Sequence, residues 1–263
     1  MSKKGVYKTQ KADNTVYYRS SFTYKNKHIS LGSFDNEKDA YNCYRDAVRI
    51  SSSSLSINDY NEHRFTIPFE KYVSIVNFRD NNVYFSNPIY LQKRFFLYYF
   101  DKKTIYKFDI DDLFYYAGHK ISKRGNHLFV ADYGMQVNIL SRYNIRSHAV
   151  VGRDYIFING DSTDFRYENI EIINQYTGVL RVTKKNEIKY KAYIHINNNF
   201  VIGYYDADYI AAIAYNKAAD ELGTTGRKYQ QNYIDFLSAR EYAEIYSQIK
   251  IPNKILDIKK ANR

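Results

Sequence analysis

One pattern of residues occurs twice in this chain of 263 residues, once near each end. The first copy runs from Gly5-Val6-Tyr7 to Gly32-Ser33-Phe34-Asp35, and the second from Gly178-Val179-Leu180 to Gly203-Tyr204-Tyr205-Asp206. Each closing glycine step is followed by a segment with Ala, Tyr and Ala on one helical stripe, and the two steps lie 171 residues apart. The repeat therefore predicts a duplicated module with a long segment between its copies.

In the first copy, alternation of polar and apolar residues predicts strands at 17–23 and 28–31, joined by a turn at 24–27. Because side chains alternate along a strand, one face is apolar and packs against a helix expected at 36–50. The inward side chains are those of Ser20, Phe22, Ile29, Leu31, Ala40, Tyr44, Ala47 and Val48. The outward strand residues are Arg19, Ser21, Thr23, His28 and Ser30.

The second copy repeats this arrangement around a turn at 197–199. Its inward strand residues are Ala192, Ile194, Phe200 and Ile202, and its outward ones are Lys191, Tyr193, His195, Asn199 and Val201. A helix is expected at 207–222 and stops at Gly223. A further helix is expected at 227–249, ending before Pro252, with a frayed tail beyond it.

Between the copies, four serines at 51–54 indicate a linker, alternation at 64–107 predicts strands, and 109–116 predicts a short helix. The expected fold is α+β, with two modules of a three-stranded antiparallel sheet plus a helix on either side of a central α+β domain. The expected parts are a first module at 1–52, a strand-rich connecting segment at 53–97, a central domain at 98–176, a second module at 177–226, and a C-terminal helix and basic tail at 227–263.

The net charge of +11 is unevenly distributed. Residues 1–50 hold ten Lys or Arg against five Asp or Glu, and residues 178–263 hold fourteen against nine, whereas the segment between them is nearly balanced at fifteen against fourteen. The excess on the repeated modules favours a polyanionic partner, with solvated surface charge as the alternative. The single cysteine, Cys43, is expected to be buried and permits no intrachain disulfide. No apolar run is long enough for a membrane span, so we expect a soluble intracellular protein without a membrane partner.

Both copies resemble the AP2/ERF-type DNA-binding domain, a three-stranded sheet backed by one helix. The resemblance rests on Gly-Val-aromatic, Tyr-x-(Ala/Ser)-x-(Ile/Phe), Leu/Ile-Gly-x-(Phe/Tyr)-Asp and a helix with Ala-x3-Tyr-x2-Ala. In that family the outer face of the sheet enters the major groove. The resemblance implies this role for Tyr7, Arg19, Ser21, Thr23, His28, Ser30, Lys191, Tyr193, His195 and Asn199. These side-chain types suit base edges and phosphates, although the Arg- and Trp-bearing face of plant members is replaced here by Ser, Thr, Val and Asn.

Residues 98–174 resemble the HNH homing-endonuclease fold, which often accompanies AP2 modules in phage and mobile-element proteins. The segment 107–112 resembles the initial strand, 139–142 the Leu-His-Arg step, and 157–161 with 165–170 the His-Ile-Asn-Gly-Asp and Asn-Arg-x-x-Asn-Leu segments.

The catalytic positions of that family are altered here. Ile156 and Phe157 replace the Asp-His pair that supplies a metal ligand and the general base, and Ser141 replaces the histidine of the Leu-His-Arg step. Arg166 and Asn169, the latter matching the second metal ligand, remain. Ile and Phe can neither bind a hard cation nor accept a proton, which predicts a pseudo-nuclease without catalytic residues, metal or cofactor.

We therefore expect a non-catalytic protein that recognises double-stranded DNA, a regulator or accessory factor of phage or mobile-element type, associated with the nucleoid in the cytoplasm of a bacterial host. One alternative is an HNH-type nicking endonuclease whose metal site has moved to His148, Asp154 and Asp161 around Asn169. The other is a phage factor that binds a host nucleoprotein machine, a polymerase or CRISPR effector, through the aromatic residues at 95–100 and 114–116.

Overall fold

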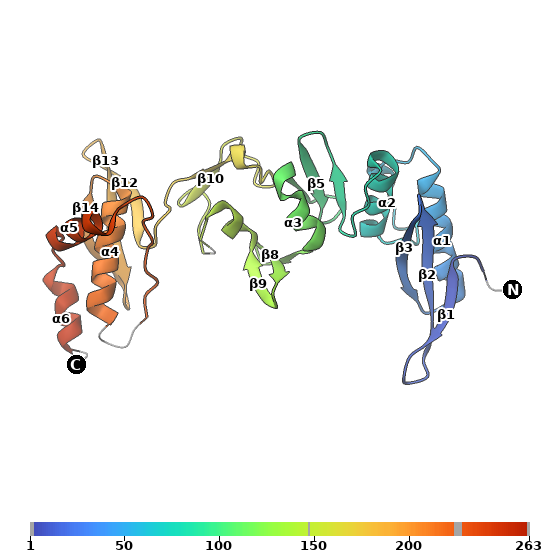
Figure 1. The fold of residues 1–263 in the computed structure, drawn as a ribbon, viewed down its shortest axis with the longest axis horizontal. Coiled ribbons are helices and arrows are strands. Elements are labelled where there is room, and N and C mark those ends of the chain that lie inside the picture. The colour runs from blue at the N-terminus through green and yellow to red at the C-terminus, as the bar shows by residue number, and fades with distance from the viewer. Residues whose placement is uncertain (1–2, 147, 224–227, 262–263) are drawn as a thin grey trace. The chain divides into compact units, whose positions relative to one another are not determined.

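The computed structural model describes residues 3–146, 148–223 and 228–261, which form two compact units (Figure 1). The first unit comprises Met1–Ile139 and Asp161–Asn169, and the second Leu140–Gly160 and Ile170–Arg263. The described residues form five small antiparallel sheets, four of three strands and one of two, together with six α-helices. This confirms the predicted α+β class. No helix in the described ranges has the length and apolar character needed to cross a membrane.

The first unit begins with the predicted sheet and helix. Strands β1 (Val6–Gln10), β2 (Val16–Tyr24) and β3 (Lys27–Phe34) pair in that order, and α1 spans Glu37–Ser51. The side-chain oxygen of Asn36 caps α1 by accepting from the backbone N–H of Asp39 at 2.8 Å. The buried stripe of α1 is Ala40, Cys43, Ala47 and Ile50. Val48 was expected on this stripe but is 39% exposed, because one residue beyond Ala47 is a rotation of about 100° around the helix axis, which carries its side chain past the edge of the stripe.

A helix occupies part of the segment 64–107, where the sequence predicts only strands. Helix α2 spans Phe69–Asn81, and the strand prediction holds only for β4 (Ile89–Leu91), β5 (Phe95–Tyr99) and β6 (Ile105–Asp109). Seven consecutive residues of α2, 72–78, are buried, so the helix has no polar stripe. Because α2 packs against both α1 and β4, apolar residues occur around the helix, and the sequence loses the 3.6-residue period of apolar positions that identifies a surface helix.

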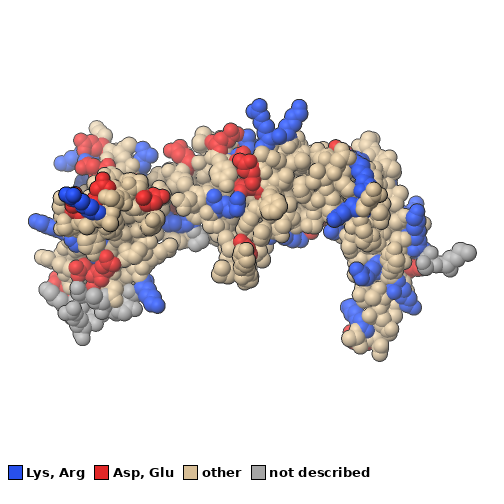
Figure 2. Space-filling model, viewed as in Figure 1, with Lys and Arg blue, Asp and Glu red and all other residues tan. Residues whose placement is uncertain are grey.

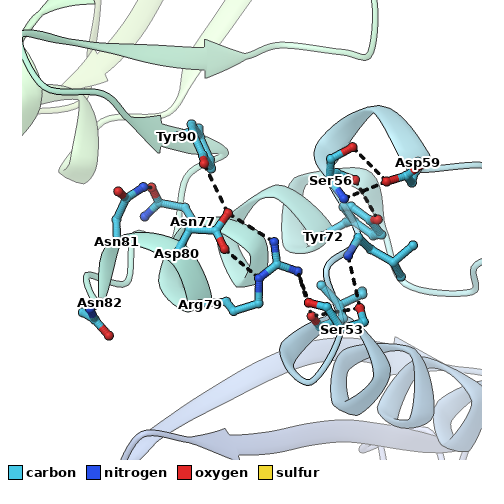
Figure 3. Close-up of polar contacts among 12 residues, drawn as sticks. Ser53, Ser56, Asp59, Tyr72, Asn77, Arg79, Asp80, Asn81, Asn82 and Tyr90 are labelled. Atoms are coloured by element: carbon cyan, nitrogen blue, oxygen red, sulfur yellow. Dashed lines mark hydrogen bonds and ion pairs between the residues drawn. The ribbon is translucent and has the colours of Figure 1, made fainter.

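Polar contacts from α2 fix its two neighbours in place (Figure 3). Arg79 Nη1 donates to the carbonyl oxygens of Ile50 at 3.1 Å and Ser53 at 2.8 Å, which caps the C-terminal end of α1. Asp80 orients this guanidinium through a hydrogen bond of 2.7 Å to Nε. The buried Asn77 accepts from the backbone N–H of Leu91 at 2.8 Å and so attaches β4 to the helix. The first module thus shares its core with α2.

The rest of the first unit contains the expected short helix and a further sheet. Helix α3 spans Leu113–Gly118, preceded by a 3-10 turn at Ile110–Asp112. Strands β7 (Ile121–Arg124), β8 (His127–Asp132) and β9 (Met135–Asn138) form a three-stranded meander. The backbone of Lys107 in β6 is hydrogen-bonded to the separate segment 161–169. Its N–H donates to the carbonyl oxygen of Thr163 at 2.9 Å, and its own carbonyl oxygen accepts from the N–H of Phe165 at 2.7 Å.

The second unit repeats the sheet-and-helix module. Strands β10 (Tyr155–Phe157) and β11 (Ile170–Ile172) form a two-stranded ribbon ahead of it. Strands β12 (Val179–Lys184), β13 (Glu187–His195) and β14 (Asn199–Tyr205) pair in order and are followed by α4 (Asp208–Gly223). Across both modules the strand residues predicted inward are buried, apart from the partly buried Phe200: Ser20, Phe22, Ile29, Leu31, Ala192, Ile194 and Ile202.

The helix predicted at 227–249 is much shorter than expected. Residues 228–237 carry no helix, and α5 spans Ala239–Gln248. It begins there because Ser238 and Glu241 form a capping box, with the Ser238 hydroxyl accepting from the Glu241 N–H. The tail was expected to fray, but Asn253–Ala261 forms α6, whose Ile255 is buried. The predicted start of this helix and the turn after Gly223 involve residues 224–227, which lie outside the described residues.

Helix α4 is therefore enclosed by protein. Nine of its 16 residues are buried, and the core around it includes β12–β14 together with Ile234, Ile249 and Ile255 from the C-terminal segment. Two asparagine side chains attach this segment, each donating to the carbonyl and accepting from the N–H of one residue, as a paired strand would. Asn216 on α4 donates to the Asn232 carbonyl at 2.8 Å and accepts from its N–H at 2.7 Å, and the Asn232 side chain makes the same pair of bonds with the backbone of Thr177.

A candidate nucleic-acid interface on two equivalent sheets

The two module sheets have the same hydrogen-bond register. Val6 pairs with Ser20 and Ser20 with Gly32 in the first, as Val179 pairs with Ala192 and Ala192 with Gly203 in the second. In each sheet the register shifts directly after the middle residue of this row. The outward positions of one sheet therefore correspond one by one to those of the other.

The repeated glycine and tyrosine have a structural explanation. Gly5 and Gly178 have φ of +75° and +70°, and an added Cβ would lie 2.1 Å from Cδ2 of Tyr44 and 2.2 Å from Cδ2 of Tyr215, respectively. Each glycine carbonyl also accepts a backbone hydrogen bond from the middle strand, at 2.9 Å in the first copy and 2.8 Å in the second. This part of the repeated pattern therefore fixes the first strand against the helix and leaves the outward face free to vary.

The outward face of β1–β3 is polar and lacks acidic groups. The row across its three strands is Tyr7, Arg19 and Ser33, and β1–β3 contain no Asp or Glu. Tyr7 is 58% exposed, and Arg19 forms no hydrogen bond or ion pair with a described residue. In the view of Figure 2, Lys and Arg outnumber Asp and Glu over the part of the surface that Figure 1 assigns to this module.

Of the other residues predicted on this face, Thr23, His28 and Ser30 are exposed. Ser21 is not: it keeps its outward place between Arg19 and Thr23, but only 8% of it is exposed. It lies on the central strand, pairs with Ser30 and donates its backbone N–H to the Gly5 carbonyl at 2.9 Å, so this short side chain is covered by its neighbours. Three residues outside the predicted set, Thr9, Tyr17 and Ser33, belong to the same face by the strand pairing. Counting in steps of two from Tyr7 and Arg19 would have found the first two.

The outward face of β12–β14 is more apolar. Its corresponding row is Leu180, Lys191 and Tyr204, and Lys191 is half-buried with no hydrogen bond or ion pair to a described residue. Tyr193 is half-buried, whereas His195 and Asn199 are exposed and joined by a hydrogen bond of 2.9 Å from ring Nδ1 to Oδ1. The predicted set omits Tyr204, which is 44% exposed.

Two further lysines on this second face are already engaged. Lys184 Nζ lies 4.0 Å from the centroid of the Tyr204 ring. Lys189 forms ion pairs with Asp206 and with Glu187, and its hydrogen bonds to these carboxylates raise the pKa of the Lys189 amine above its ordinary value. The second face therefore presents less free positive charge than its lysine content indicates.

The degenerate HNH positions fall in both units and hold structural roles where contacts are defined. In the second unit, Ser141 is exposed in a 3-10 helix (Ile139–Tyr143), and Ile156 and Phe157 are strand residues that pair with Glu171 and Ile170. In the first unit, Arg166 and Asn169 both bind Asp164: Arg166 Nη2 lies 2.8 Å from Oδ2, and Asn169 Nδ2 lies 2.8 Å from the carbonyl oxygen.

Two buried aspartates of the central region, Asp154 and Asp164, are neutralised by arginine. Burial of Asp164 raises its pKa, but hydrogen bonds from Arg166 outweigh this and lower the pKa to about 2. Asp154, one of the residues considered for a relocated metal site, pairs with Arg146 at 3.1 Å and Arg153 at 2.7 Å. Among the described residues, no group of three or more His, Cys, Asp or Glu is placed to hold a metal ion.

The aromatic runs considered for a protein partner are divided between core and surface. Phe96, Tyr98 and Tyr116 are fully buried, whereas Phe114 is 94% exposed on α3. No protein-family model matches the chain, and neither the curated proteins nor the solved structures contain a match. The AP2/ERF and HNH resemblances therefore remain predictions.

Proposed function

We propose that this protein binds double-stranded DNA through the outward faces of β1–β3 and β12–β14, as a non-catalytic regulator or accessory factor of phage or mobile-element type. The observation that carries the proposal is the correspondence of Arg19 and Lys191. They occupy the same register position in two copies of one sheet, and neither has a charge partner among the described residues. An unpaired cationic side chain at the same position of both sheets is suited to binding a phosphate or the edge of a guanine.

The dimensions of the sheets are compatible with the major groove. Three strands spaced about 4.8 Å apart span about 10 Å, and the major groove of B-DNA is about 12 Å wide. In the first sheet the hydroxyls of Tyr7 and Ser33 lie in the same row as Arg19, so donors and acceptors accompany the charge. Two such sheets on one chain raise the effective concentration of each other's site, which compensates for modest affinity in each.

The same proposal assigns no hydrolysis to the central region. Ile156 and Phe157 carry no metal-binding or basic side-chain atom, and Asp154 in the second unit and Asp164 in the first are already bound to arginines. Incubation of the protein with supercoiled plasmid and Mg²⁺ or Mn²⁺ is expected to leave the plasmid intact. Nicking by stoichiometric protein would favour the alternative of a relocated nuclease site.

The decisive test compares charges on and off the outward faces. Arg19→Ala and Lys191→Ala are expected to weaken binding to a mixed-sequence duplex and to reduce the slope of log K against log salt by about 0.9 for each phosphate that the variant no longer neutralises. Matched controls are Arg45→Ala on α1 and Lys250→Ala after α5, which remove exposed positive charges away from the sheets. If the controls weaken binding as much as Arg19→Ala and Lys191→Ala, the sheets are not the interface.

A further inference from the structure

A short loop ahead of the second module, residues 148–153, is closed around a buried aspartate. The Asp154 carboxylate accepts from the backbone N–H of Val150 at 2.8 Å and from Nη2 of Arg153 at 2.7 Å. The backbone N–H groups of Arg153 and Asp154 both donate to the carbonyl oxygen of Val150, at 3.2 Å and 2.8 Å. These hydrogen bonds fix the conformation of the loop and of the Arg153 side chain.

This loop is attached to the first strand of the second module sheet. The carbonyl oxygen of Asp154 accepts from the backbone N–H groups of Ile173 at 2.8 Å and Asn174 at 3.0 Å. The Asn174 side chain donates to the carbonyl oxygen of Arg153 and accepts from the backbone N–H of Arg181 on β12 at 2.6 Å. A single side chain thus joins the loop to the edge strand of the sheet, and both belong to the second unit.

The attachment brings Arg153 beside the outward face of this sheet. Nε and Nη2 of Arg153 donate to Asp154 at 3.1 Å and 2.7 Å, whereas Nη1 forms no hydrogen bond with a described residue and 47% of the side chain is exposed. The hydrogen bond to Asp154 raises the pKa of the Arg153 guanidinium, and the electrostatic interaction with the phenol of Tyr193 raises this pKa further. Tyr193 is an outward residue of β13, so Arg153 adds an accessible cation next to that face.

The charge of this region favours an anionic ligand. Residues 140–153 contain three arginines and no Asp or Glu. The carboxylate of Asp154 binds both Arg146 and Arg153, so one of these two positive charges is not compensated. Free positive charge is scarce on the sheet itself, where Lys189 is engaged by two carboxylates. A cation at the border of a face that enters a groove is suited to a phosphate, because phosphates line the edges of the groove.

We propose that Arg153 binds a phosphate of the DNA duplex that lies on the outward face of β12–β14, so that the loop 148–153 forms a border of the second DNA-binding surface. This inference rests on the proposed function and adds to it a contact from outside the two sheets. It also explains why Arg153 is held by two of its nitrogens: a guanidinium already fixed by Asp154 loses little conformational freedom when its remaining Nη1 binds a phosphate oxygen.

The test measures binding of the full chain to a short mixed-sequence DNA duplex by fluorescence anisotropy at several salt concentrations. Arg153→Ala is expected to weaken binding by about threefold and to reduce the slope of log K against log salt by about 0.9, the value for one phosphate contact. Arg153→Lys keeps the charge but cannot hold Asp154 through two nitrogens, and is expected to retain most of the affinity. The matched control is Arg181→Ala, which removes an exposed arginine of β12 on the opposite face from Leu180 and is expected to change neither quantity.

An added charge tests the loop without disturbing Asp154, and so decides the question even if Arg153→Ala fails to fold. Val151→Lys places a cation at a position of the loop that is 53% exposed, and is expected to strengthen duplex binding by about twofold with a steeper salt dependence. Ala243→Lys, at an exposed position of α5 away from the sheet, is expected to leave the affinity unchanged.

Unchanged affinity and slope in both Arg153→Ala and Val151→Lys would overturn the phosphate contact. Equal losses from Arg153→Lys and Arg153→Ala would also overturn it, because they would show that Arg153 acts only by holding Asp154. If Arg19→Ala and Lys191→Ala still weakened binding in either case, the two sheets would bind DNA without the loop. If none of these variants weakened binding, the proposed function would fail as well.

Discussion

The two module sheets share a backbone and differ in the surface they present. Their registers, bulges and glycine–tyrosine contacts coincide, yet the row Tyr7–Arg19–Ser33 corresponds to Leu180–Lys191–Tyr204. The first sheet contains no acidic residue, whereas the second holds Lys189 between two carboxylates. The features that the fold requires are therefore repeated in both sheets, whereas the outward side chains that a ligand would contact differ.

Under the proposed function, this difference divides the work between the sheets. The first face supplies open charge and hydroxyl groups, which favour phosphates and polar base edges. The second face supplies Leu180, Val182 and the exposed Val201, which favour apolar contact such as the methyl group of thymine. We therefore expect binding through the first sheet to depend more strongly on salt.

The largest expected effect tests the shared backbone. Gly5→Ala and Gly178→Ala are each expected to destabilise their unit by about 3 kcal/mol or more, since Cβ would overlap a tyrosine ring and adjacent backbone. Gly125→Ala is the control, because its φ of +56° is similar but no atom lies within 4 Å of the added Cβ; it isolates the conformational cost of about 1–2 kcal/mol. Chemical denaturation measures all three. A small effect at only one of the two module glycines would break the structural equivalence.

A second prediction concerns a property that both sheets should share. The major groove of an RNA duplex is too deep and narrow for a sheet to enter, so DNA duplex is expected to bind about tenfold or more tightly than RNA duplex of the same sequence. Competition binding checks this for the unaltered chain and for Arg19→Ala and Lys191→Ala. If one variant lost the preference entirely, a single sheet would carry the discrimination.

Arg19 and Lys191 are expected to contribute unequally to the affinity for duplex DNA. Arg19→Ala should weaken duplex binding by about tenfold and Lys191→Ala by about threefold, because Arg19 is exposed on a polar face and Lys191 is half-buried on an apolar one. Fluorescence anisotropy at several salt concentrations measures both affinity and slope. Equal losses would show that the surrounding surface does not set the contribution of the charge.

The smallest expected effect comes from a double substitution that makes the charge of the second sheet resemble that of the first. Glu187→Gln with Asp206→Asn removes the two carboxylates that engage Lys189, and is expected to strengthen duplex binding by about two- to threefold with a steeper salt dependence. Glu241→Gln with Glu244→Gln, which also removes two negative charges but on α5 away from the sheet, controls for net charge. An equal gain from the control would assign the effect to net charge alone.

Sequence patterns predicted the modules because two signals agreed there: alternation along the strands and a glycine at each end of the sheet. They failed at α2 because a helix buried over 72–78 has no polar stripe, and so lacks the period of 3.6 that marks a surface helix. They also failed at 228–237, although Ser238 and Glu241 form a capping box that marks the true start of α5.

The candidate interface was predictable to the same extent. Arg19, His28, His195 and Asn199 follow from alternation within a strand and lie outward as expected. The burial of Ser21 depends on its place on the central strand, next to the Gly5 carbonyl, which alternation along one strand does not reveal. The partners of Lys189 depend on which residues the second hairpin brings together.

The enclosure of α1 and α4 has a mechanical consequence. Each helix is held between its sheet and further helices, so the sheets have stiff supports and little freedom to change curvature. If such surfaces meet DNA, the adjustment needed for a close fit must come from the nucleic acid. Preference among targets would then depend on how easily each sequence deforms, and pliable pyrimidine–purine steps would be favoured even where no side chain touches a base.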